Sequence, residues 1–147
     1  MKWDNFEESS KELPEIVVEK LIEGFSVATK DLVQLAVAPV ADLTRLTANI
    51  LKTRFQFRVY LMSSKLPDYS FRVFEFGYNV ALYPVKLSIT QVIREELNSK
   101  GESYIQVSTI EDEEKFESAV KLVFKSAKFT EIVGGLMKIA GKKEELF

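Results

Sequence analysis

The chain has 147 residues, of which 46% are hydrophobic and 29% charged, and its formal net charge is −2. This length and composition fit one globular domain. The small negative charge argues against general nucleic-acid binding, which needs an excess of Lys and Arg to neutralise phosphates. The sequence contains neither cysteine nor histidine. It therefore excludes disulfides, thiolate and imidazole metal sites, and the usual catalytic triads.

The N-terminal segment does not have the composition of a secretory signal. MKWDNFEESSKELPE is acidic and has no apolar centre. The most apolar run, LVQLAVAPVA at 32–41, is interrupted by Gln34 and is much shorter than the roughly 20 residues that cross a bilayer. We therefore expect a cytoplasmic protein without a transmembrane segment.

Residues 1–53 are predicted to form a helical N-terminal region. Pro14 suits the first turn of a helix that continues through EIVVEKLIEGFSVA. Asp31 followed by Gln34 is a variant of the capping box and predicts a second helical segment, which Pro39 kinks or ends. Apolar residues then recur at helical spacing as far as Leu51, which favours two or three helices with one apolar face each.

Residues 54–89 carry the strongest strand signal. Nine of the chain's aromatic residues (11 Phe, 5 Tyr and 1 Trp in all) fall within this segment. It also holds five basic and two acidic side chains, which gives it a charge of +3. The sequence predicts a β-hairpin whose two strands flank a short polar connection containing Pro67 and Asp68.

The alternation of side chains in this hairpin predicts which face is buried. One apolar face comprises Phe55, Phe57, Val59 and Leu61 in the first strand, and Phe74, Phe76 and Tyr78 in the second. After Leu82 the apolar positions shift by one residue, and Pro84 makes an unbroken central strand improbable. This shift predicts either a strongly bent strand or two successive strands.

The remainder of the chain is predicted as helix, strand and helices. Thr90 can cap a short helix, QVIREELN, that ends before Gly101, and SYIQVSTI (103–110) has a strand pattern. A helical stripe starts after Glu111, and Ser126 can cap a further helix. Within that helix Gly134 and Gly135 predict a break or the close approach of another backbone.

These elements predict a single α+β domain over residues 1–147. Its helical N-terminal region (1–53) precedes a strand–helix–strand–helix region (54–147). We expect a bent, mainly antiparallel sheet of three to four strands, with the C-terminal helices packed on it. The acidic run from Glu111 to Glu114 matches no metal-binding loop and suits the first turn of a helix, so we expect no metal and no cofactor.

A polar set of side chains on the hairpin is the candidate ligand or partner surface. Arg58, Tyr60, Glu75 and Asn79 are predicted on the face opposite the aromatic rings. The simplest interpretation is a cross-strand ion pair between Arg58 and Glu75; the functional one is a polar binding site on the sheet.

Three functions agree with the sequence. The first is a non-catalytic accessory protein that binds a protein partner or itself, as a homodimer, through a helix or the sheet edge. The second is a carrier of a small apolar ligand or lipid, with a cavity between sheet and C-terminal helix lined by Phe55, Phe57, Phe74, Phe76 and Phe124. The third is a carboxylate-dependent enzyme that uses Glu75 with Tyr60 or Arg58. The absence of histidine and cysteine argues against catalysis.

Overall fold

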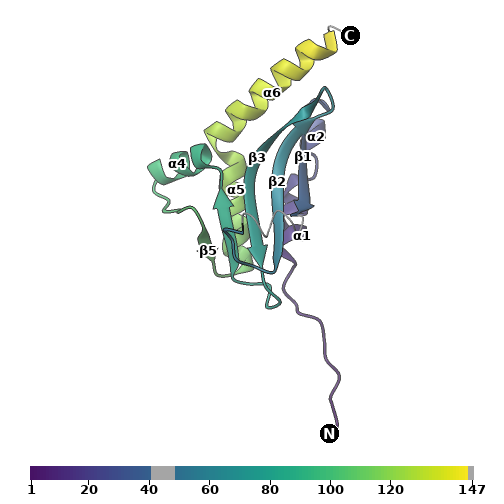
Figure 1. Ribbon diagram of the computed structural model, residues 1–147, viewed down its shortest axis with the longest axis vertical. Helices are drawn as coiled ribbons and strands as arrows, with labels where there is room; N and C mark the ends of the chain where they lie inside the picture. The colour runs from purple at the N-terminus through teal and green to yellow at the C-terminus, as the bar shows by residue number, and fades with distance from the viewer. Residues whose placement is uncertain (41–48, 146–147) are drawn as a thin grey trace.

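The computed structural model describes residues 1–40 and 49–145 and has an α+β fold (Figure 1). A single antiparallel sheet contains, in spatial order, β1 (Gln34–Pro39), β2 (Phe55–Ser63), β3 (Leu66–Tyr78), β4 (Val85–Ile89) and β5 (Ser108–Ile110). Helices precede and follow the sheet, which confirms the predicted fold class. Within the described residues the strands number five, whereas three to four were predicted.

The additional strand is β1, in a segment predicted to be helical. Its side chains alternate: Leu35 and Val37 lie on the core side, opposite Leu61 and Val59 of β2, and Ala36 and Ala38 face the other way. The helix prediction was wrong here because alanine and leucine favour helices only when no partner strand competes for the backbone. The predicted helix after Pro39 falls largely on residues 41–48, outside the described residues.

The predicted β2–β3 hairpin is confirmed, but its turn is tighter than expected. Ser64 and Lys65 form the turn, whereas Pro67 and Asp68 already belong to β3. At the other end of β3 the chain reverses direction before Val85, where β4 begins. The predicted shift in alternation is therefore a boundary between two successive strands.

A β-bulge at Val73 divides β3 into two parts. The pairing with β2 shifts between Val59 and Tyr60, because β3 contributes one extra residue at this point. The backbone N–H of Thr90 donates to the Val73 carbonyl (3.0 Å), and its hydroxyl donates to the Arg72 carbonyl. The bulge thus keeps its carbonyls paired, and it turns Arg72 to the same side of the sheet as Tyr60.

Helices cover one face of the sheet. These are α1 (Pro14–Ile22), the short α2 (Phe25–Ala28), α5 (Glu113–Lys125) and α6 (Ala127–Glu145), and α5 runs behind β3 in Figure 1. The ring of Phe76 lies 5.3 Å from that of Phe116, and the ring of Phe74 lies 5.9 Å from that of Phe124. These contacts confirm that the C-terminal helices pack on the sheet.

The segment between β4 and α5 follows the prediction in part. Helix α4 (Gln91–Ser99) starts after Thr90, and Gly101 takes the predicted left-handed conformation after it, with φ of +106°. The predicted strand over 103–110 is reduced to β5, which comprises only its last three residues.

The break between α5 and α6 is confirmed at Ser126. Its hydroxyl oxygen accepts a hydrogen bond from the Phe129 N–H (3.1 Å), as an N-cap residue does. The carboxylate of Glu96, in α4, accepts two more, from the Ala127 N–H (2.9 Å) and the Lys128 N–H (2.6 Å). Three of the free N–H groups at the start of α6 are therefore satisfied.

The prediction for Gly134 and Gly135 was wrong. Both lie inside α6, and a Cβ atom added at either would find no atom within 4 Å, so no second backbone approaches them. The helix continues because its other face is packed, with Leu136 and Ala140 buried. Tertiary packing of one face offsets the poor helix propensity of two glycines.

Candidate functional site

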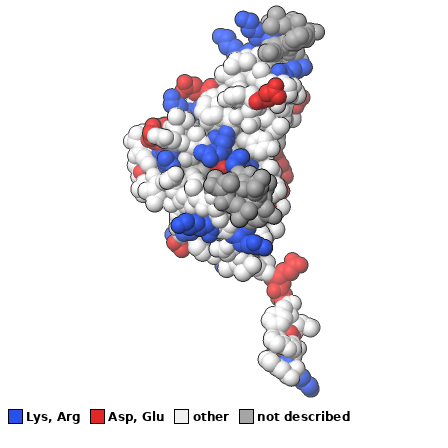
Figure 2. Space-filling view, viewed as in Figure 1, with Lys and Arg blue, Asp and Glu red and all other residues white. Residues whose placement is uncertain are grey.

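The second face of the sheet has no described helix packed against it; we call it the open face. In Figure 1 the helices α1 and α5 lie behind the sheet and the open face is turned toward the reader. By strand register its outward side chains include Ala36, Ala38, Arg58, Tyr60, Met62, Ser70, Arg72, Glu75 and Lys86. Figure 2, in the same view, shows Lys and Arg side chains gathered near the middle of this face.

Two arginines share one carboxylate at the centre of the open face. Glu75 Oε1 lies 2.8 Å from Arg58 Nε and 3.4 Å from Arg72 Nη1. The Glu75 side chain is 9% exposed, whereas those of Arg58 and Arg72 are 41% and 49% exposed. The carboxylate is therefore buried beneath two accessible guanidinium groups, and the predicted Arg58–Glu75 ion pair is confirmed.

Hydrogen bonds to described residues use only part of the donor capacity of this cluster. Each guanidinium carries five N–H donors, and among the described residues the only acceptor for those of Arg58 and Arg72 is Glu75. Two positive charges and one negative charge leave a formal net charge of +1. Fork-shaped guanidinium groups bind carboxylates and phosphates through paired hydrogen bonds, so this arrangement suits an anionic group.

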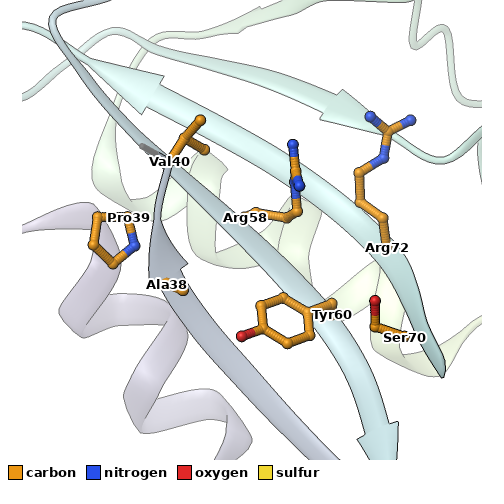
Figure 3. A pocket seen from close by; sticks show the side chains of 7 residues that line it. All are labelled: Ala38, Pro39, Val40, Arg58, Tyr60, Ser70 and Arg72. Carbon is orange, nitrogen blue, oxygen red and sulfur yellow. The ribbon is translucent and has the colours of Figure 1, made fainter. Parts of the chain in front are cut away.

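A hollow of about 460 Å³ lies beside the two arginines (Figure 3). It is lined by Ala38, Pro39, Val40, Arg58, Tyr60, Ser70 and Arg72. The side chains of Arg58 and Arg72 point to the same side in Figure 3, and the Tyr60 ring lies lower on the sheet. The small side chain of Ala38 leaves space above β1.

A second hollow of about 410 Å³ lies further along the open face, toward the turn of the β2–β3 hairpin. It is lined by Gln34, Met62, Ser63, Ser64, Pro67, Asp68, Tyr69 and Ser70. Ser70 borders both hollows, and Met62 and Tyr69 are exposed. The two hollows together offer a surface that is cationic at one end and partly apolar at the other.

The structure brings together three of the four predicted surface residues. Arg58, Tyr60 and Glu75 share the open face, whereas Asn79 lies beyond the end of β3. The side-chain oxygen of Asn79 accepts a hydrogen bond from the Arg54 N–H (2.9 Å), which ties the end of β3 to the start of β2. Asn79 therefore holds the hairpin and is not part of the cluster.

Arg72 was missed because simple alternation places it on the opposite side from Glu75. The bulge at Val73 reverses that assignment. One signal was present in the sequence: without a bulge, Arg72 would point into the aromatic core, where an unpaired charge is costly. A charged residue at an expected core position is thus a cue for a bulge.

The five predicted cavity residues occupy different environments. Phe74 and Phe76 are fully buried, Phe57 and Phe124 are half-buried, and Phe55 is exposed. Their rings contact one another and their neighbours at centroid distances of 5.3 to 6.0 Å. None of them lines either hollow of the open face.

A second polar cluster lies at the helix-covered side and holds the N-terminal segment to the core. The Tyr78 hydroxyl donates to the carboxylate of Glu15 in α1 (2.7 and 3.0 Å), and the Tyr83 hydroxyl donates to the Glu12 carbonyl (3.2 Å). Burial, followed by the hydrogen bond to Glu15, raises the pKa of Tyr78 well above its ordinary value. These hydrogen bonds therefore hold the start of α1, and the residue Glu12 just before it, against the end of the sheet.

Comparison of the chain with protein-family models, curated proteins and solved structures finds no match. Within the described part of the chain, no three acidic side chains converge as a metal site would require. No helix among those residues is long and apolar enough to cross a membrane.

Proposed function

We propose that this protein is a non-catalytic binding protein whose open face receives an acidic segment of a protein partner. The observation that carries this proposal is the shared Glu75 carboxylate, which holds Arg58 and Arg72 side by side while their side chains stay 41% and 49% exposed. A buried anchor reduces the conformational freedom that two free arginines would lose on binding. The pair is thereby preorganised for a carboxylate.

The surroundings of the pair favour a peptide segment over a simple ion. The partly apolar hollow beside Met62 and Tyr69 adjoins the cationic one at Ser70, so acidic and apolar side chains of one segment can be bound together. The edge strand β1 borders both hollows through Gln34 and Ala38.

Nucleic acid is a poorer candidate for this face. Its basic residues in the register of β1–β4 are Arg58, Arg72 and Lys86, and Glu75 offsets one of the three charges. The whole chain carries −2, and binding to a phosphate backbone depends on many neutralised charges.

The test is fluorescence anisotropy with a labelled peptide that combines three glutamates and two phenylalanines, separated by glycines. We expect Arg58→Ala and Arg72→Ala each to weaken its binding by about tenfold, equivalent to about 1.4 kcal/mol. Binding should also weaken as salt is raised.

Lys121→Ala is the matched control, because Lys121 is an exposed cation on α5, on the helical side of the sheet. It should leave the affinity unchanged. Equal binding of the wild-type protein to the peptide with lysine in place of glutamate would contradict the proposal, as would unchanged binding by both arginine variants.

A further inference from the structure

The first ten residues form an exposed tail with an unusual composition. The tail extends away from the folded body in Figure 1, and all ten of its residues are exposed. Trp3 and Phe6 are 70% and 83% exposed, with ring centroids 5.9 Å apart. Asp4, Glu7 and Glu8 lie in the same ten-residue segment. Two large aromatic rings in solvent, among three acidic side chains, are typical of a segment that binds a partner.

The tail is fastened where it joins the fold. The Glu12 N–H donates to Glu113 Oε1 in α5 (2.7 Å), the Tyr83 hydroxyl donates to the Glu12 carbonyl (3.2 Å), and α1 begins at Pro14. The residues before this anchor form a tether with a reach of about 35 Å when extended. This reach is comparable with the diameter of a compact domain of this size, so the tail is long enough to contact a neighbouring molecule.

We propose that the tail of one copy of this chain docks on the open face of a second copy. This inference rests on the proposed function and names its partner. The tail carries three acidic side chains against one lysine, and the open face carries Arg58, Arg72 and Lys86 against Glu75. The two surfaces are therefore complementary in charge.

The apolar groups are complementary as well. Trp3 and Phe6 provide rings for the partly apolar hollow beside Met62 and Tyr69, and an aromatic ring also stacks on an exposed guanidinium such as that of Arg72. Acidic and aromatic side chains are interspersed over the few residues from Trp3 to Glu8, so one short segment can present both kinds of group to the two hollows.

Exchange of tails is reciprocal. Each copy has one tail and one open face, so a two-fold dimer satisfies both tails and leaves no unfilled face. The tail leaves the body at α1, which packs on the helical side of the sheet, and in Figure 1 it extends beyond the end of the sheet instead of folding back over the open face of its own copy. This direction favours docking on a second molecule.

The experiment uses the full-length chain, because Trp3 is its only tryptophan and reports directly on the tail. We expect Trp3 emission to shift to shorter wavelength as protein is concentrated from about 0.1 to 100 μM, in parallel with dimer formation by sedimentation. Arg58→Ala and Arg72→Ala should each move the midpoint to about tenfold higher concentration, and Lys121→Ala should not move it.

Changes within the tail test the same contact without risk to folding. Glu7→Lys with Glu8→Lys should weaken the dimer by more than tenfold, because it reverses the charge of the tail opposite Arg58 and Arg72. Both residues are exposed, so the change should leave the fold intact. Lys2→Ala is the control and should leave the dimer unchanged or slightly tighter. Emission typical of solvent-exposed tryptophan at every concentration would overturn the proposal. A blue shift that does not depend on concentration would also overturn it, by showing docking within one molecule.

Failure of this inference can be told apart from failure of the proposed function. The glutamate–phenylalanine peptide is titrated into the same samples. If the peptide binds and Trp3 stays exposed, only the tail proposal is lost. If the peptide does not bind and Trp3 stays exposed, both are lost. A concentration-dependent shift that persists in both arginine variants would place the tail elsewhere and contradict the proposed contact.

Discussion

Replacing Gly77 by alanine should destabilise the fold severely, and the structure gives the reason. A Cβ atom at Gly77 would lie 2.0 Å from Thr53 Oγ1 and 2.9 Å from the Phe55 carbonyl oxygen. The hydroxyl of Thr53 can move, but the carbonyl belongs to β2 and cannot give way without displacing the strand. Gly77 pairs with Gln56, two positions along from the Arg58–Glu75 pair, so the strain falls next to the candidate site.

The size of the effect follows from these distances. Overpacking a well-packed site costs typically 1 to 3 kcal/mol, and a clash with backbone belongs at the upper end, so we expect a loss of about 3 kcal/mol in the free energy of unfolding. The same substitution at Gly134 is a matched control. That position lies in a helix with no atom within 4 Å of the added Cβ, so Gly134→Ala should stabilise by about 1 kcal/mol.

Urea denaturation followed by circular dichroism measures both variants. Adding Thr53→Ala to Gly77→Ala removes the nearest atom, Thr53 Oγ1, and leaves the Phe55 carbonyl in place. The double variant should therefore recover only part of the lost stability. A Gly77→Ala protein as stable as wild type, or a loss at Gly134 as large as that at Gly77, would refute the contact geometry described here.

Three further predictions concern the polar contacts that hold the helices. Ser126→Ala should lower the free energy of unfolding by about 1 kcal/mol, because Ser126 caps α6, and Ser118→Ala on the exposed face of α5 is the control. A loss no greater than that of the control would contradict the cap. The N–H groups of Lys128 and then Ala127 hold the pKa of Glu96 below its ordinary value. The stabilisation from Glu96 is therefore present above the unfolded pKa of a glutamate and is lost as pH falls through the lowered folded value. Glu96→Gln should flatten the fall of the urea midpoint between about pH 6 and pH 3, and an unchanged slope would count against this role. Tyr78, whose pKa is raised by burial and by the bond to Glu15, should stay protonated after the exposed tyrosines have ionised in an ultraviolet absorbance titration. Its contribution to stability is complete below the ordinary tyrosine pKa and is lost as pH rises above it. Burial raises the pKa of Tyr83 as well, so Tyr78→Phe should remove one of two late-ionising groups, and an unchanged titration would contradict the assignment.

The sequence predicted those parts of the fold that local chemistry decides. The hairpin followed from dense aromatic alternation, and the break at Ser126 followed from a capping residue between two apolar helical stripes. β1 was missed because QLAVAP has no local feature that outweighs the helix propensity of its alanines. Its conformation is decided by pairing with β2, which is distant in sequence.

The candidate site was predictable in outline but not in its second cation. Arg58 and Glu75 lie opposite each other in an ordinary antiparallel register, which alternation alone identifies. Arg72 depends on the bulge at Val73, which a sequence read with a fixed period of two cannot reveal. Thr90, 17 positions after Val73 in the chain, holds the bulge by its hydrogen bonds. The bulge therefore depends on a tertiary contact and not on the local sequence.

The most direct test of the central claim is the affinity of the acidic peptide for Arg72→Ala, measured beside wild type and Lys121→Ala at one salt concentration. Arg72 is the decisive residue because its place beside Glu75 was not predicted from the alternation of the sequence and was found in the structure. A loss of about tenfold in Arg72→Ala, with Lys121→Ala unchanged, is the predicted result. Equal affinity of all three proteins for the peptide would contradict the open face as a binding surface.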